Sequence, residues 1–177
     1  MISPAARERF QSAPWLTELD PTARLALLNV LEEHRVPPGT ELLVQGQPND
    51  RIIFQLAGTS IATRQYDSPR EELRAPLESP CVYGEISFFR PTPGLATVRA
   101  VTPVWFLTLD RPGYDALRRA DPRTAEQLAR AILRVLAERF EVLDRRVTDF
   151  LAEHENHHPR ASEWNDFRAR LFEESNI

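Results

Sequence analysis

The 177-residue chain contains one cysteine, one methionine and no lysine, so arginine supplies all 22 of its basic side chains. The single cysteine, Cys81, excludes an internal disulfide and a cysteine-rich zinc site. No apolar run approaches the ~18 residues of a membrane helix, and the first ten residues lack the apolar core of a signal peptide. These absences predict a cytoplasmic protein with no membrane partner, no metal and no cofactor.

Two further absences bear on activity. Proteins that bind nucleic acid are usually basic, whereas this chain has a formal net charge of −4, so we expect no DNA partner. The chain also lacks a nucleophile elbow, a Walker loop and an H-E-x-x-H motif. We therefore expect a protein that is not an enzyme.

The pattern along the chain is helices, then strands, then helices. Residues 1–35 carry helical signals, among them Asp20-Pro21 as a helix start, and we expect helix to end before Val36. In residues 36–110, short apolar runs alternate with turn residues, which predicts a sandwich or jelly roll.

Residues 111–151 return to a helical pattern. After Arg123, seven apolar residues recur at spacings of three and four: Leu128, Ile132, Leu136, Phe140, Leu143, Val147 and Phe150. This stripe is longer than a small β-roll can cover, so we predict that the helix makes a homodimer contact. The alternative is that the whole stripe packs on its own domain.

Residues 152–177 form a tail. Four of its apolar residues are spaced as one face of a short amphipathic helix: Trp164, Phe167, Leu171 and Phe172. Such a helix needs a docking surface, on its own domain, on a twin subunit or on another protein. We interpret His154, His157 and His158 as solvated side chains rather than metal ligands.

Several segments carry a family resemblance: Val36–Thr40, Gln45-Gly46, Tyr83–Phe89, Ala96–Ala100 and Leu107–Arg111. Together they resemble the cyclic-nucleotide-binding domain family, which includes bacterial regulators of the catabolite-activator type. The resemblance implies an α+β fold, in which a β-roll (jelly roll) is flanked by N-terminal helices and a long C-terminal helix. The family's DNA-binding regulators continue into a winged helix of about 70 residues, which the 26 residues after Leu151 cannot hold.

Residues 83–100 resemble the family's phosphate-binding cassette. A tight turn at Gly84 leads into one helical turn whose free N–H groups face an anion. The resemblance implies that Glu85 accepts a ribose hydroxyl and that a downstream arginine neutralises the cyclic phosphate.

The cassette is degenerate at that arginine. Alignment on Ala96-Thr97-Val98 puts Gly94 in its place and puts Leu95 where the family has a small or hydroxyl residue. A charge-assisted bond to phosphate contributes about 1.5–3 kcal/mol. Its loss predicts at least ~10–100-fold weaker binding of cyclic AMP or cyclic GMP. Restoring both residues, with Gly94→Arg and Leu95→Ser, is expected to recover affinity.

Two other arginines are candidates to replace the missing one. Arg90 lies in the loop before Gly94 and Arg99 lies on the following strand, where it could also pair with Glu85 or face water. The candidate pocket therefore comprises ten residues: Gly84, Glu85, Ile86, Ser87, Arg90, Gly94, Leu95, Ala96, Thr97 and Arg99.

The sequence is best interpreted as a non-enzymatic bacterial regulatory or protein-interaction module. It is expected to pair with itself and with a protein partner that the sequence does not identify, and not to bind cyclic AMP or cyclic GMP in the family's usual way. The alternative is a small-molecule sensor. Such a sensor would bind a nucleotide second messenger, a cyclic mononucleotide or a cyclic dinucleotide, through a non-standard pocket.

Overall fold

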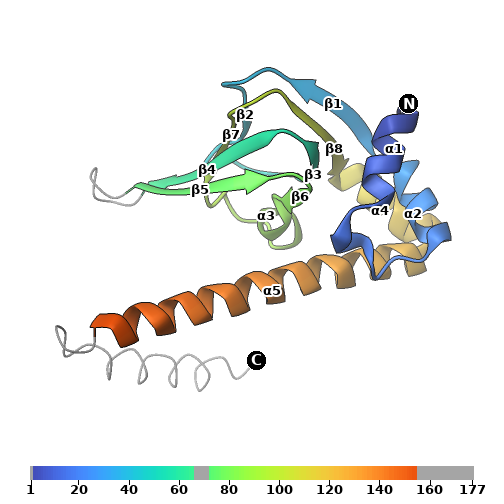
Figure 1. Cartoon of the computed structure of the whole chain (residues 1–177). Coiled ribbons are helices and arrows are strands. Elements are labelled where there is room, and N and C mark those ends of the chain that lie inside the picture. Colours follow the sequence, from blue (N-terminus) through green and yellow to red (C-terminus); the bar gives the residue numbers. More distant parts are fainter. Residues whose placement is uncertain (1, 66–71, 155–177) are drawn as a thin grey trace. The chain divides into compact units, whose positions relative to one another are not determined.

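The computed structural model describes residues 2–65 and 72–154. The chain divides into two compact units, Met1–Leu133 and Arg134–Ile177. The elements, labelled in Figure 1, are α1 (Pro4–Gln11), a 3-10 turn η1 (Pro14–Leu16), α2 (Pro21–Leu28), β1 (Glu32–Val36), β2 (Glu41–Leu43), β3 (Arg51–Ala57), β4 (Thr59–Gln65), β5 (Glu72–Glu78), β6 (Cys81–Tyr83), α3 (Glu85–Phe89), β7 (Thr97–Ala100), β8 (Val104–Asp110), α4 (Arg111–Ala120) and α5 (Pro122–His154). This is the α+β arrangement expected, a β-roll with N-terminal helices and a long C-terminal helix.

The N-terminal helices are shorter than expected. The side chain of Asp20 caps α2 by accepting a 2.9 Å hydrogen bond from the backbone N–H of Ala23, as the sequence predicts. The expected helix up to residue 35 is wrong, because α2 ends at Leu28 and Glu32–Val36 form β1. Strand β1 pairs along its whole length with β8, and this long-range pairing overrides the local helix propensity.

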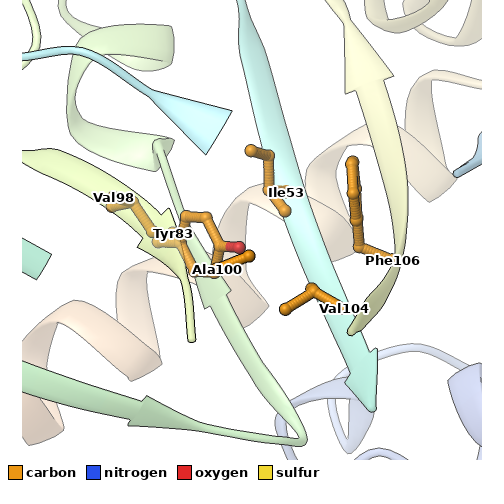
Figure 2. Close-up of a cluster of buried hydrophobic side chains, with 6 residues drawn as sticks. All are labelled: Ile53, Tyr83, Val98, Ala100, Val104 and Phe106. Atoms are coloured by element: carbon orange, nitrogen blue, oxygen red, sulfur yellow. The ribbon is translucent and has the colours of Figure 1, made fainter. Parts of the chain in front are cut away.

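The strands form two four-stranded antiparallel sheets. The first has the order β1-β8-β3-β6 and the second the order β2-β7-β4-β5. Figure 2 shows six side chains from both sheets that pack together between them: Ile53, Tyr83, Val98, Ala100, Val104 and Phe106. Because side chains alternate along a strand, the residues between these core positions on β7 face away from the core.

Two contacts hold the N-terminal segment on the first sheet. Trp15 stacks on Phe54 at 5.1 Å between ring centroids, and Phe10 meets both rings edge-on. On β1, Glu33 accepts hydrogen bonds from the backbone N–H of Ser3 at 2.7 Å and from the indole N–H of Trp105 at 2.8 Å. The N-terminus is therefore attached by packing and by a shared carboxylate.

Helix α5 begins within the first unit. Its Gln127 exchanges two hydrogen bonds with Asp20, of 3.0 and 3.1 Å. Leu128 and Ile132 are buried, so their prediction as dimer contacts is wrong: both belong to the chain's own core. Further along, Phe140, Leu143 and three more of the predicted stripe residues lie on the part of α5 that belongs to the second unit.

The exposed part of that stripe lies in the second unit. Phe140, Leu143 and Phe150 are 61%, 58% and 59% exposed, whereas Leu136 and Val147 are half-buried. The predicted amphipathic segment from Trp164 to Phe172 lies outside the described residues, as do His157 and His158. Among the described residues, none of the helices has the length and apolar character needed to cross a membrane.

Candidate functional site

The cassette turn is built as the sequence predicts. Gly84 has a φ of +87°, and a Cβ there would lie 2.7 Å from the carbonyl oxygen of Arg51. Only glycine fits this left-handed position against a neighbouring backbone. The side-chain amide of Asn49 fixes the turn by donating to the carbonyls of Gly84 and Arg51, at 2.9 Å each.

The helical turn after Gly84 is firmly anchored. Within α3, Glu85 and Ser87 are buried and Ile86 is exposed. Arg111 lies over the ring of Phe88 at 4.3 Å and also donates a hydrogen bond to its carbonyl oxygen. The start of α4 therefore holds α3 in place.

Gly94 lies in a buried, tightly packed position. Its N–H donates to the carbonyl of Gln47 at 2.8 Å, and its own carbonyl accepts from the N–H of Gly46 at 2.9 Å. A Cβ at Gly94 would lie 2.8 Å from the carbonyl oxygen of Val44, where backbone cannot yield cheaply. An arginine at this position would not fit without moving the 44–48 turn. Recovery of affinity by Gly94→Arg with Leu95→Ser therefore stays a prediction, and it depends on movement of this turn.

The roll interior next to the cassette contains a hydrogen-bonded polar cluster. Gln55 is completely buried, and its side-chain oxygen accepts from Ser60 at 2.6 Å and from the Tyr83 hydroxyl at 3.0 Å. Its amide nitrogen donates to the carbonyls of Gly58 and Leu77 at 3.0 and 3.1 Å. Burial raises the pKa of the Tyr83 hydroxyl. These groups satisfy one another inside the roll.

Arg90 and Arg99, the candidates to replace the family's phosphate-binding arginine, lie in different places. Arg90 is exposed at the end of α3. Arg99 pairs with Glu41, with 2.5 Å between its Nη2 and the carboxylate Oε1, rather than with Glu85 as considered from the sequence. Leu95 is 44% exposed, so it does not fill the roll interior.

Arg99 lines a cavity on the outer face of the second sheet. On β7, Val98 and Ala100 belong to the core, so the intervening Thr97 and Arg99 face outward. The cavity has a volume of about 790 Å³. Its lining comprises Glu41, Val44, Gln45, Gly46, Ile61, Thr63, Gln65, Arg74, Thr97 and Arg99. We call it the outer-face cavity. Of the ten predicted pocket residues, it brings together only Thr97 and Arg99.

A family model for the cyclic nucleotide-binding domain matches residues 33–121, about half of the chain and the whole β-roll with α4. The chain belongs to this family. Its fold is that of the family's regulatory domains, as the sequence resemblance implied.

Relatives of this cyclic nucleotide-binding domain agree with the fold. It is 32% identical over 136 residues to the CRP-like cAMP-activated global transcriptional regulator of Mycobacterium tuberculosis, across 75% of this chain and 58% of the relative. The chain thus spans less than two thirds of that relative's length. The N-terminal domain of a transcriptional regulator from Streptomyces coelicolor is 27% identical with a TM-score of 0.64, over 76% of this chain and 94% of that one. A cyclic nucleotide-binding domain from Methylobacillus flagellatus has a TM-score of 0.74 at 18% identity, over 82% and 84% of the two chains, and shares the fold.

Sequence reasoning missed eight of the residues that line the outer-face cavity of this domain. Ile61, Thr63 and Gln65 alternate along β4, and this period-2 spacing is a signal that all three share one face. Arg74 joins them because it pairs with Thr63 in the β4–β5 hairpin. That register depends on the length of the connection, so the sequence pattern alone does not reveal it.

Proposed function

We propose that this chain is a non-enzymatic regulatory domain that acts through protein contacts and does not bind cyclic AMP or cyclic GMP through its cassette. The family assignment establishes the fold, and this proposal adds the function of the domain. It also places the domain in the cytoplasm, as a homodimer paired through the exposed part of α5.

The observation that carries the proposal is the environment of Gly94. The position where the family resemblance implies a phosphate-binding arginine has no side chain, and a Cβ there would meet the carbonyl oxygen of Val44 at 2.8 Å. Two backbone hydrogen bonds hold the loop against the 44–48 turn. Glu85, which the family resemblance implies would accept a ribose hydroxyl, is buried. A cyclic phosphate in the cassette would lack the charge-assisted hydrogen bonds that an arginine at position 94 would donate.

Self-association is supported by the exposed stripe on α5. Leu136, Phe140, Leu143, Val147 and Phe150 follow one another at spacings of four and three, which is the heptad pattern of paired helices. Three of them are more than half exposed. Large apolar side chains exposed in a row are characteristic of an interaction surface.

Isothermal calorimetry with cyclic AMP and with cyclic GMP tests the ligand half of the proposal. We expect no saturable heat at micromolar protein, and no rise in melting temperature at millimolar nucleotide. A ligand at 100 times its dissociation constant would add about 2.7 kcal/mol to the stability, which melting detects easily. The positive control is the Mycobacterium tuberculosis relative, whose name describes it as cAMP-activated. Micromolar binding that Glu85→Gln abolishes would refute the proposal.

A further inference from the structure

Strand pairing arranges five side chains of the outer-face cavity in two neighbouring rows. In the first row, Arg99 of β7 lies opposite Glu41 of β2 on one side and opposite Ile61 of β4 on the other. In the second row, Thr97 of β7 lies opposite Thr63 of β4. Directly paired residues share a face of the sheet with their Cβ atoms about 5 Å apart, and the two rows are about 7 Å apart. The five side chains therefore surround one small area of the sheet.

The two charged side chains of the first row neutralise each other. Nη2 of Arg99 lies 2.5 Å from Oε1 of Glu41. This contact leaves the second carboxylate oxygen as an acceptor and leaves N–H donors on the guanidinium, which carries five. An anion at Arg99 would have to compete with Glu41 and would be repelled by its charge. A neutral ligand with hydroxyl groups instead meets a donor and an acceptor side by side.

Three further side chains of the cavity have hydrogen-bonding groups that find no partner among the described residues. The Thr97 hydroxyl accepts a 3.0 Å hydrogen bond from the backbone N–H of Gln45, but its own proton is not donated to any group in this part of the chain. Within the same residues, the Thr63 hydroxyl and the Gln65 side-chain amide make no hydrogen bond. Together these groups offer donors and acceptors, which suits hydroxyl groups because each O–H both donates and accepts.

Gln45 fixes one wall of the cavity. Its side-chain amide donates to the carbonyl of Gln65 at 2.8 Å and accepts from the N–H of Gln65 at 2.9 Å. The side chain thus replaces a neighbouring strand at the end of β4, because the pairing of β4 with β7 ends at Thr63 and Thr97. A wall that is already held in place needs little reordering when a ligand binds, which favours affinity.

We propose that the outer-face cavity binds a neutral polyhydroxyl compound, a sugar or an open-chain polyol, between the Glu41–Arg99 pair and the Thr63 and Thr97 hydroxyls. The volume of about 790 Å³ lies within the range of small-molecule sites. Ile61 and Val44 supply apolar surface for the C–H groups of such a ligand. The inference goes beyond the function proposed above and does not depend on it.

A titration of the full chain, followed by backbone amide NMR shifts, tests the proposal. The probes are methyl glucopyranoside as a ring sugar and sorbitol as an open-chain polyol. We expect one or both to shift the amides of Thr63, Thr97 and Arg99 saturably at millimolar concentration. The tighter of the two shows whether the ligand is a ring sugar or an open-chain polyol. Absence of saturable shifts with both probes would overturn the proposal.

Two further compounds separate recognition of hydroxyl groups from other causes of binding. Fully O-methylated methyl glucopyranoside keeps the ring but has no O–H donors, so it should bind at least about tenfold more weakly. Benzoate at constant ionic strength should give no saturable shift at the same amides, because Glu41 already neutralises Arg99. Equal binding of the methylated sugar, or tighter binding of benzoate than of both hydroxyl compounds, would also overturn the proposal.

Matched variants locate the binding. Thr63→Val removes a hydroxyl at nearly constant shape and should weaken binding about 3–10-fold. Glu41→Gln should weaken it about tenfold or more, because hydrogen bonds to a charged acceptor are stronger. Thr17→Val is the control, since Thr17 is exposed and does not line the cavity, and it should leave binding unchanged. Unchanged binding in Thr63→Val, or an equal loss in Thr17→Val, would contradict the site.

Discussion

The indole N–H of Trp105 donates a 2.8 Å hydrogen bond to the carboxylate of Glu33, which also accepts two hydrogen bonds from Ser3. Arg35 lies over the same indole ring at 4.2 Å. Burial raises the pKa of Glu33, but the hydrogen bonds from Ser3 and Trp105 and the charge of Arg35 outweigh it, so the pKa lies below its usual value of 4.5. The ionised form is therefore the one that the fold stabilises.

This arrangement predicts a pH-dependent contribution to stability. A carboxylate with a lowered pKa contributes fully above the pKa of the unfolded chain, and the contribution is lost as the pH falls through the folded value. Glu33→Gln should lower the free energy of unfolding by about 1–2 kcal/mol at pH 7. Urea unfolding should show the difference from the unchanged protein shrinking below pH 4.5. A difference that stays constant down to pH 3 would contradict this role of the charge.

The packing around Gly94 predicts a cost for any side chain there. Gly94→Ala should destabilise the domain by about 1–3 kcal/mol, because the new methyl group meets the Val44 carbonyl. Gly94→Arg should cost more and should not create affinity for cyclic AMP. Leu95→Arg is the matched control, since it adds the same side chain at an exposed neighbour and should change stability by less than about 0.5 kcal/mol. A stable Gly94→Arg variant that binds cyclic AMP would show that the loop can rearrange.

The buried polar cluster predicts unequal effects of its members. Tyr83→Phe removes one donor to Gln55, whose oxygen still accepts from Ser60, so the loss should be about 1 kcal/mol. Gln55→Leu leaves Ser60 and the carbonyls of Gly58 and Leu77 without this partner and should cost several times more. Urea unfolding of both variants measures the two losses of unfolding free energy. Equal losses in Tyr83→Phe and Gln55→Leu would contradict this prediction.

Tyr83 also predicts a response to high pH. Its pKa is raised by burial above the usual 10.0, so the neutral phenol stabilises the fold below pH 10, and this stability is lost as the pH rises towards the folded value. The stability of the unchanged protein should therefore fall relative to Tyr83→Phe above pH 10. If the free energies of unfolding of the two proteins changed with pH in parallel, the Tyr83 hydroxyl would be accessible to solvent, and this prediction would be wrong.

Exposed apolar residues on α5 predict an oligomer. Light scattering should give about twice the chain mass at tens of micromolar. Phe140→Glu with Leu143→Glu should shift the equilibrium to monomers, because charges would be buried in the contact. Val142→Glu is the control: Val142 is 48% exposed but lies on the opposite side of the helix from Phe140. A monomer before any substitution, or equal disruption by Val142→Glu, would reject this surface.

Local patterns predicted those features of the fold that depend on local chemistry. The left-handed turn at Gly84, the cap at Asp20 and the strand-rich centre all follow from neighbouring residues. The helix that the sequence predicts up to residue 35 is wrong at Glu32–Val36, because the partner strand β8 lies about 70 residues further along the chain. Likewise, the roles of Leu128 and Ile132 depended on how far the domain's own core extends along α5.

The candidate site shows the same division. The motif spacing predicts that Gly94 replaces the family's arginine, but only the structure shows that the 44–48 turn occupies the adjacent space. Arg74 could not be assigned to a site without the hairpin register that puts it beside Thr63. The space beside Gly94 and the position of Arg74 both depend on long-range packing, which the sequence pattern does not show.

The pair of backbone hydrogen bonds between Gly94 and the 44–48 turn has a consequence for signalling. A ligand shifts an equilibrium only by its differential affinity for two conformations. Here the loop after α3 is joined to its neighbour through both its N–H and its carbonyl, so an alternative arrangement begins with the loss of both bonds. A ligand that switches this loop must therefore bind the alternative conformation more tightly by at least the free energy that these two bonds contribute.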